Sequence, residues 1–242
     1  MRCLNLLSAF VLVALAACSS VDYYDNGDVA RISSTNDSIV LQPVGTEPIE
    51  LKTVNGEISV GKGYSLNDVK TVNGEIHLGP EIIAKHVRTV NGDIALERGS
   101  VVDSLRAVNG NVWVNNSKIV GDTRTVNGRI QTRENTHIGG SVTTSNGRIT
   151  LFDTIVERDV SMSDGKIDLN NTVVKGNVVV REKRFWDFFD FDIFSPKVII
   201  GPNSIVEGDI IVQRKAKLYV HESAKIASIE GVEAQYYSGD RP

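Results

Sequence analysis

The sequence predicts an all-β protein, a single-stranded β-helix (solenoid) of about ten 18-residue coils. Two observations predict it. The phrase Thr-Val-Asn-Gly returns every eighteen residues from Thr53 to Thr125, with Ala107 in place of Thr in one copy, and looser copies begin at Thr144 and Met162. Apolar residues two positions apart, such as Ile58 and Val60, recur with each copy, which is the alternation of a strand and not of a helix. A fixed short period indicates one unit stacked on copies of itself.

The N-terminal residues predict a secretory signal peptide over residues 1–17. Arg2 precedes an apolar run from Leu6 to Leu15, and Cys18 follows it. The run is too short to stay in the bilayer as a spanning anchor. An ordinary cleaved signal, with Cys18 incidental, is one interpretation of this pattern.

The segment Leu15-Ala16-Ala17-Cys18 resembles the lipobox of bacterial lipoproteins. The resemblance implies that Cys18 becomes the mature N-terminus and the site of lipid attachment. Each buried methylene of the acyl chains contributes ~0.8 kcal/mol, so triacylation gives a stable anchor. Ser19 and Ser20 follow the cysteine, so no Asp stands there. In the lipoprotein family the absence of this Asp resembles sorting to the outer membrane, which implies an outer-membrane lipoprotein that faces the periplasm.

The rest of the chain reads as a tether and one elongated domain. Residues 18–34 are polar and turn-prone, without a period, so we expect a lipidated cysteine and a flexible linker there. Thr35 stands eighteen residues before Thr53 and opens a degenerate first coil. The predicted β-helix domain therefore spans residues 35–242, with an insertion at 181–197.

The third and fourth positions of the repeated phrase predict a sharp corner. Asparagine amides stacked in register bond to the residues above and below, as in cross-β assemblies. Glycine at the next position is expected to supply the positive φ of the corner. The structural ladder is the favoured interpretation, and a repeated ligand site is the alternative. The ladder asparagines are Asn55, Asn73, Asn91, Asn109, Asn127 and Asn146.

The valine at the second position has an ambiguous orientation. Alternation counted back from Ile58 points Val54 inward, whereas alternation from the buried position before the phrase points it outward. A bend or bulge must therefore lie in between. If the valines face outward, they form an exposed apolar stripe suited to contacts.

A column of positive charge precedes each phrase. Like charges stacked along a ladder repel each other, so the column needs counter-charges or a polyanionic partner. A solvated face with pairing across the corner is one interpretation, and contact with an anionic envelope glycan or lipopolysaccharide is the other. The residues of this predicted polyanion contact are Lys70, Arg88, Arg106 and Arg124, after Lys52. The fifth position is acidic in early coils and turns basic at Arg129, Arg148 and Lys166.

An aromatic segment interrupts the period within residues 181–197. An insertion in a solenoid emerges as a loop, often on the binding side. Aromatic side chains interleaved with Asp suit a protein partner or self-association, while a flap folded back on the rod is the alternative. The predicted partner-binding residues are Phe185, Trp186, Phe188, Phe189, Phe191 and Phe194.

Composition and motif spacing argue against several functional classes. The formal net charge of −4 lacks the basic surplus expected of a nucleic-acid binder. The histidines His77, His86, His137 and His221 fall at unrelated positions of the period, so the sequence predicts no metal site. We likewise predict no catalytic residue and no cofactor.

The repeats resemble a bacterial β-solenoid family of adhesin-like proteins of unknown function. The resemblance covers most of residues 53–178. The segment from Val198 to Ile210 looks like the coils of bactofilins, which are polymer-forming β-helices, and the whole layout is similar to uncharacterised proteobacterial lipoproteins. The resemblance implies a right-handed helix and leaves self-assembly open.

These observations lead to one functional expectation and its alternatives. We expect a non-catalytic lipoprotein, anchored in the outer membrane, that acts as a scaffold or interaction module in the cell envelope. A protein partner or a second copy would bind the aromatic segment. A glycan-binding or lipopolysaccharide-binding β-helix is the alternative, followed by an enzyme acting on polysaccharide.

Overall fold

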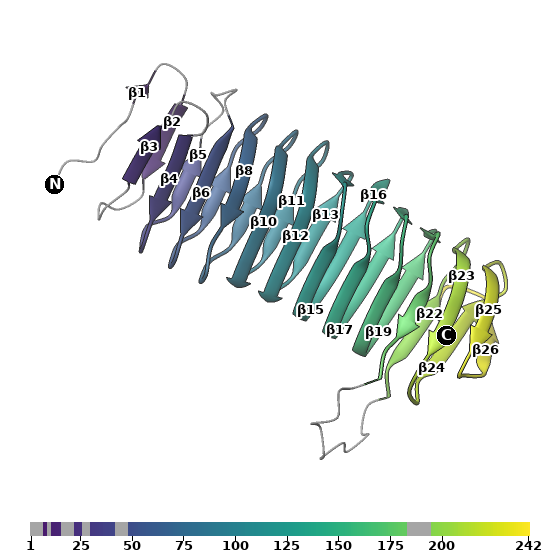
Figure 1. Cartoon of the computed structure of the whole chain (residues 1–242). Coiled ribbons are helices and arrows are strands. Elements are labelled where there is room, and N and C mark those ends of the chain that lie inside the picture. The colour runs from purple at the N-terminus through teal and green to yellow at the C-terminus, as the bar shows by residue number, and fades with distance from the viewer. Residues whose placement is uncertain (1–6, 9–10, 16–21, 26–29, 42–47, 183–194) are drawn as a thin grey trace, which may run out of the picture.

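The computed structural model describes residues 7–8, 11–15, 22–25, 30–41, 48–182 and 195–242. Over these residues the chain forms an all-β parallel β-solenoid of about 10 turns of ~18 residues, without a helix. The turns stack along one axis into a rod, with β25 (Lys225–Glu230) and β26 (Ala234–Tyr237) at its C-terminal end (Figure 1). The predicted fold class is confirmed.

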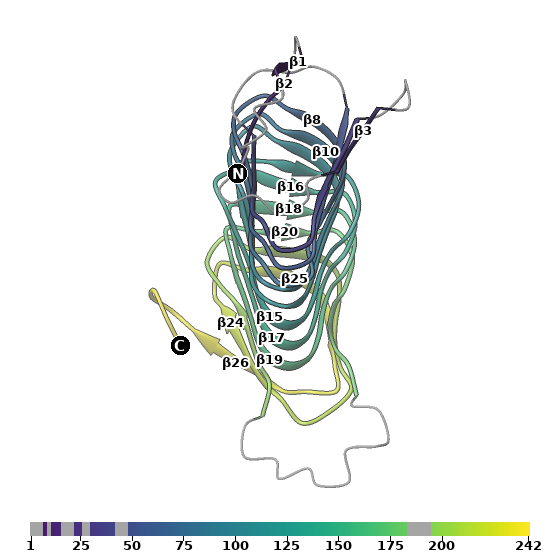
Figure 2. The ribbon, with the colours of Figure 1, turned by 90° about the vertical axis from the view of Figure 1, so that its left-hand side faces the viewer.

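Each turn has two long flanks that meet at the Asn-Gly corner and a short side that closes the turn (Figure 2). The first flank precedes the corner and contains β4 (Ala30–Ser34), β6 (Ile49–Thr53), β8 (Ser65–Lys70), β10 (Ile83–Asn91), β12 (Val101–Asn109), β21 (Val178–Val180), β23 (Ile205–Val212) and β25. The second flank contains β5 (Ile39–Leu41), β7 (Ile58–Val60), β9 (Ile76–Leu78), β11 (Ile94–Leu96), β13 (Val112–Asn115), β22 (Lys197–Ile200), β24 (Lys217–His221) and β26.

Some strands belong to more than one side. Strands β15 (Thr123–Arg133), β17 (Val142–Phe152) and β19 (Val160–Asn170) run through the corner from the first flank to the second. The short side contains β14 (Lys118–Ile119), β16 (Thr136–Ile138), β18 (Thr154–Val156) and β20 (Val173–Val174), together with the first residues of the longer first-flank strands.

The core is built from columns of equivalent apolar residues, because successive turns pair in parallel register. Ile58 pairs with Ile76, which pairs with Ile94. Only one face of each strand lines the core of the rod, so the residues between the core positions point to solvent. Truncating one core residue, such as Ile94→Ala, costs ~2–5 kcal/mol. The column continues through Val112, Ile130, Ile149, Ile167, Val198 and Leu218, all buried.

The stack begins earlier than residue 35. Strand β4 starts at Ala30 and pairs in parallel with β6, so residues 30–34 of the predicted tether belong to the first turn. Antiparallel strands flank this end: β3 (Asp22–Asp25) pairs with β4, and β2 (Val11–Leu15) pairs with β5 and with β1 (Leu7–Ser8). Antiparallel partners of this kind cover the open edge of a parallel stack, and of the three only β3 lies after the predicted signal peptide.

The corner glycines serve a different purpose from the predicted one. Of the glycines that follow the ladder positions from Gly56 to Gly165, only Gly165 has a φ in the left-handed region, at 113°. The turns instead approach so closely that a Cβ on Gly92 would lie 1.9 Å from the carbonyl oxygen of Gly74. Glycine is therefore required by the spacing of the backbones and not by a positive φ.

The valines at the second position point outward. Val54 is 41% exposed, and Val72, Val90, Val108 and Val126 are half-buried, while the preceding Thr53 is buried. The break in alternation lies at the Asn-Gly corner, because Asn55 also faces solvent. The valines form a partly covered apolar line beside the corner and not a fully exposed stripe.

Candidate functional site

The asparagines at the corner form a continuous ladder of side-chain hydrogen bonds. The Nδ2 of Asn91 donates to the Oδ1 of Asn73 at 2.8 Å, and Asn109 donates to Asn91 at 2.8 Å. The ladder begins one turn earlier than the sequence suggested, at Asn36, which accepts from Asn55 at 2.9 Å. The remaining rungs join Asn73 to Asn55, Asn127 to Asn109 and Asn146 to Asn127 at 2.7–3.1 Å. Because the amides bind one another, they serve first as structure.

Buried threonines support the same corner. Thr89 Oγ1 donates to the carbonyl oxygen of Gly74 at 3.1 Å, and Thr125 Oγ1 donates to that of Gly110 at 3.0 Å. Each bond ties one turn to the glycine of the turn before it. In these turns the threonine of the repeated phrase satisfies its own buried hydroxyl while it fixes the approach of two turns, whereas the Oγ1 of Thr144 has no hydrogen-bond partner among the described residues.

Four cations of the first flank form what we call the upstream basic column: Lys70, Arg88, Arg106 and Arg124. The backbone register places them opposite one another, with Lys70 against Arg88, Arg88 against Arg106 and Arg106 against Arg124. All four are exposed. None has an ion-pair partner among the residues that the structure describes. Stacked turns lie ~4.8 Å apart, so neighbouring cations repel by roughly 1 kcal/mol in water.

Lys52, which precedes the column, has an ion-pair partner. Its Nζ contacts Oε1 of Glu50, while Arg31 Nε donates to Oε2 of the same carboxylate at 2.6 Å. Desolvation by burial raises the pKa of Glu50, but the hydrogen bonds from Lys52 and Arg31 outweigh it and lower the pKa below its usual value. The unpaired part of the column therefore starts at Lys70.

The second flank carries a longer set of cations, the downstream basic column: Arg129, Arg148, Lys166, Lys197 and Lys217. Register pairs each residue with the next in this order. Sequence periodicity identified the first three. Lys197 and Lys217 were missed because the insertion shifts them out of the 18-residue count, although each stands one residue before a core position.

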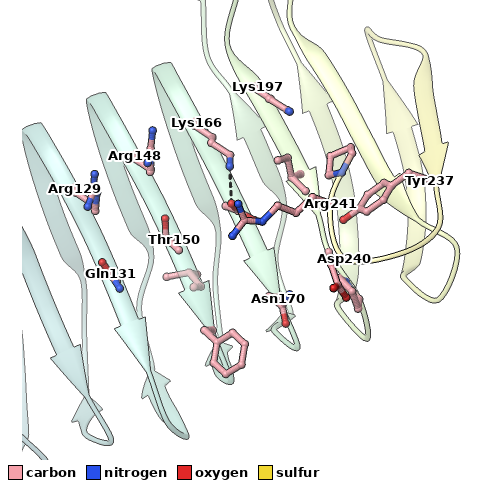
Figure 3. A pocket seen from close by; sticks show the side chains of 17 residues that line it. Arg129, Gln131, Arg148, Thr150, Lys166, Asn170, Lys197, Tyr237, Asp240 and Arg241 are labelled. Atoms are coloured by element: carbon pink, nitrogen blue, oxygen red, sulfur yellow. Dashed lines mark hydrogen bonds and ion pairs between the residues drawn. The ribbon is translucent and has the colours of Figure 1, made fainter.

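A groove lies beside this column, between the second flank and the C-terminal arm (Ser238–Pro242), with a volume of ≈ 670 Å³ (Figure 3). Strands β15, β17, β19 and β22 form one wall, and the arm contributes Asp240 and Arg241. Arg241 reaches from the arm toward the turn that carries Lys166 (Figure 3). Lys166 Nζ donates to Asp168 Oδ2 at 2.6 Å, and Lys197 Nζ lies 4.3 Å from the ring centroid of Tyr219.

Tyr237 holds the start of the arm against the rod. Strand β26 pairs with β24, which places Tyr237 opposite His221, and their rings meet edge to face with centroids 5.1 Å apart. Burial, with a further contribution from the negative charge of Asp168, raises the pKa of Tyr237. The phenol therefore stays neutral at physiological pH and lines the groove as a hydrogen-bonding group.

Several predicted residues lie outside the described part of the chain. Cys18 is one, and the aromatic residues Phe185, Trp186, Phe188, Phe189, Phe191 and Phe194 are others. The described strands on either side of this segment keep the register of the stack, because Met162 pairs with Val180 and Lys166 pairs with Lys197.

A cluster of paired side chains lies on the short side. Glu157 accepts from His137 Nε2 at 2.9 Å and contacts Lys175 Nζ at 2.8 Å. The hydrogen bonds from Lys175 and from His137 lower the pKa of Glu157. These three residues come from consecutive turns, and the charge of Lys175 is compensated by Glu157, unlike the charges of the upstream basic column.

The part of the chain that the structure describes contains no helix long and apolar enough to cross a bilayer. Comparisons with protein-family models, with curated proteins and with solved structures found no match. The chain is therefore placed by its architecture alone, as a β-solenoid of about 10 parallel turns.

Proposed function

We propose that the protein is a non-catalytic interaction scaffold of the cell envelope, and that its first flank binds an extended anionic polymer such as an acidic glycan. The observation that carries the proposal is the upstream basic column. Lys70, Arg88, Arg106 and Arg124 are exposed, aligned along the rod and without ion-pair partners among the described residues. A polymer with regularly spaced negative charges relieves their mutual repulsion along the whole column.

The neighbours of the column support this partner. His86 and Ser104, two residues before Arg88 and Arg106, bond to each other at 3.0 Å and carry no negative charge. On the other side of the arginines stand the outward valines Val90 and Val108. The centre of the column is thus a strip of positive charge beside apolar surface, suited to the charged and apolar faces of a saccharide chain.

The binding test uses polygalacturonate as the anionic polymer and dextran as its neutral counterpart. Arg88→Gln with Arg106→Gln is expected to weaken polygalacturonate binding at least tenfold and to flatten its dependence on salt, because two screened charge contacts are removed. The matched control is Arg98→Gln with Arg158→Gln, two exposed arginines outside both columns. Equal losses in the two double variants, or equal binding of dextran, would contradict the proposal.

Membrane attachment rests on Cys18 and its resemblance to a lipobox. The proposal places the rod at the outer membrane, facing the periplasm, with residues preceding the first turn as the link. The membrane-bound parent protein should carry acyl-chain mass on an N-terminal Cys18, as read by mass spectrometry, and Cys18→Ala should lose that mass. An unacylated N-terminus on the membrane-bound parent protein would overturn the anchor.

A further inference from the structure

The groove beside the C-terminal arm differs in kind from the open face of the first flank. Its volume of ≈ 670 Å³ lies in the range of small-molecule sites, about 300–1,000 Å³. Two separate parts of the chain enclose it: the second flank, and the arm held by the contact of Tyr237 with His221. Figure 2 shows the arm leaving the outline of the rod on the side of β24 and β26.

The groove carries an excess of positive charge. Its lining includes five cations, Arg129, Arg148, Lys166, Lys197 and Arg241, against the two carboxylates Asp168 and Asp240. One carboxylate is already engaged, because Asp168 accepts from Lys166 at 2.6 Å. Arg129 and Arg148 stand opposite each other in register and have no ion-pair partner among the described residues. An anion in this groove meets cations from the wall and from the arm (Figure 3).

Neutral hydrogen-bonding groups run parallel to the cations. Gln131 and Thr150 follow Arg129 and Arg148 by two residues, so they face the same side of the strands. On β19 the same row continues with Asp168, and Asn170 lies two residues further along the strand, opposite Phe152. The exposed Phe152 and the ring of Pro202 border them. The site therefore combines charge on one side with amide and hydroxyl groups and apolar surface on the other.

We propose that this groove binds a phosphorylated saccharide. A phosphate group contacts the guanidinium groups of Arg129 and Arg148 on neighbouring turns, since arginine donates to phosphate oxygens in a planar, bidentate manner. The sugar hydroxyls bond to Gln131, Thr150 and Asn170, and the ring lies against Phe152. Arg241 approaches from the arm and engages a second phosphate. This site is distinct from the polymer surface of the first flank and goes beyond it.

Calorimetry with three soluble probes tests the site: fructose 1,6-bisphosphate, inorganic pyrophosphate and fructose. The bisphosphate is expected to bind once per chain, and more tightly than pyrophosphate, while fructose does not bind. Arg148→Gln should weaken the bisphosphate at least tenfold, and Arg241→Gln should weaken it less. Thr150→Val should weaken the bisphosphate but leave pyrophosphate unchanged, because only the sugar uses that hydroxyl.

The control is Arg106→Gln, which removes the same charge from the first flank and is expected to leave the three affinities unchanged. If Arg106→Gln also loses polygalacturonate binding, that loss tests the polymer surface of the first flank and leaves the groove proposal unaffected. Vesicles carrying lipid A, a phosphorylated disaccharide lipid, separate a membrane headgroup from a free sugar phosphate. The site is supported if the soluble sugar phosphate or the lipid A vesicles bind and if this binding is lost in Arg148→Gln. Pyrophosphate binding as tight as the bisphosphate overturns the saccharide, and no saturable binding of any phosphorylated probe overturns the site.

Discussion

Arg214 Nη1 lies 3.8 Å from Oδ2 of Asp164, and it donates to the carbonyl oxygen of Ser163, 51 residues earlier in the chain, at 3.3 Å. Asp164 occupies the ladder position that asparagine holds in the earlier turns, and it pairs in register with Asn146. No Asn-Gly phrase stands between Val180 and Lys197, in the turn between Asp164 and Arg214. An arginine from the following turn therefore bonds at the corner where the next asparagine rung would stand.

This relationship predicts a coupled effect on stability. Arg214→Ala is expected to lower the free energy of unfolding by about 1–3 kcal/mol, because it removes a hydrogen bond and an ion pair whose arginine side chain is only 10% exposed. Asp164→Asn should cost less on its own, since Asn resembles the other rungs. Urea unfolding of both single variants and the double variant gives the coupling energy. Strictly additive effects would show that the two residues do not act together.

The close approach of the backbones at the corner glycines predicts that two Gly→Ala substitutions lower the free energy of unfolding by clearly different amounts. Gly92→Ala places a Cβ 1.9 Å from the oxygen of Gly74, so the turns must separate, at a cost of about 3 kcal/mol or more. Gly63 is the matched control: it has a φ of 81° with nothing near its missing Cβ. Gly63→Ala should cost only the backbone strain, about 1–2 kcal/mol. Similar losses for the two variants would contradict the close approach as the reason for glycine at the corner.

The repeated phrase predicted most of the architecture because a solenoid converts sequence period directly into register. Asn73 and Asn91 are eighteen residues apart in the chain and are hydrogen-bonded in the structure. The same logic located the upstream basic column. The predicted positive φ at the corner glycines was wrong. A sequence shows that a position needs glycine, but it does not show whether a positive φ or a close approach of the backbone is the cause.

The 18-residue period did not predict features that depend on contacts between distant segments or on segments outside the repeat. Arg214 lies beyond the insertion, so no repeat position linked it to Asp164. The groove requires the arm to return beside β19 and β22, and nothing in the local sequence around Arg241 predicts that return. Lys197 was detectable only by aligning it on the following core residue, Val198, and not by counting from the preceding turn.

The asparagine ladder predicts that interior rungs matter more than the terminal one. Asn91 donates one side-chain bond and accepts another, whereas Asn36, within the described part of the chain, accepts one from Asn55 and donates none. Asn91→Ala is therefore expected to destabilise by about 1–2 kcal/mol and Asn36→Ala by about half of that, since each net hydrogen bond contributes ~0.5–1.5 kcal/mol. Chemical denaturation measures both. An equal or larger loss at Asn36 would contradict a ladder whose strength comes from rung-to-rung bonds.

Acid is expected to loosen the N-terminal turn through Glu50. Hydrogen bonds from Lys52 and Arg31 lower the pKa of this carboxyl in the folded protein, despite the opposing effect of burial. A lowered folded-state pKa means that the stabilisation is fully present above the unfolded value of about 4.5 and is lost as the pH falls through the folded value. Below that window, Arg31 and Lys52 face each other without the shared carboxylate.

Hydrogen exchange resolves this effect by segment, because turns at the end of a solenoid open independently of its centre. Between pH 6 and pH 3.5, amides of residues 30–34 and 49–53 should lose protection earlier than those of residues 101–109 in the middle of the rod. Glu50→Gln should already show the low-protection pattern at pH 6 and change less with pH. If the variant and the parent protein respond to acid in the same way over residues 30–34, Glu50 is not the group that titrates.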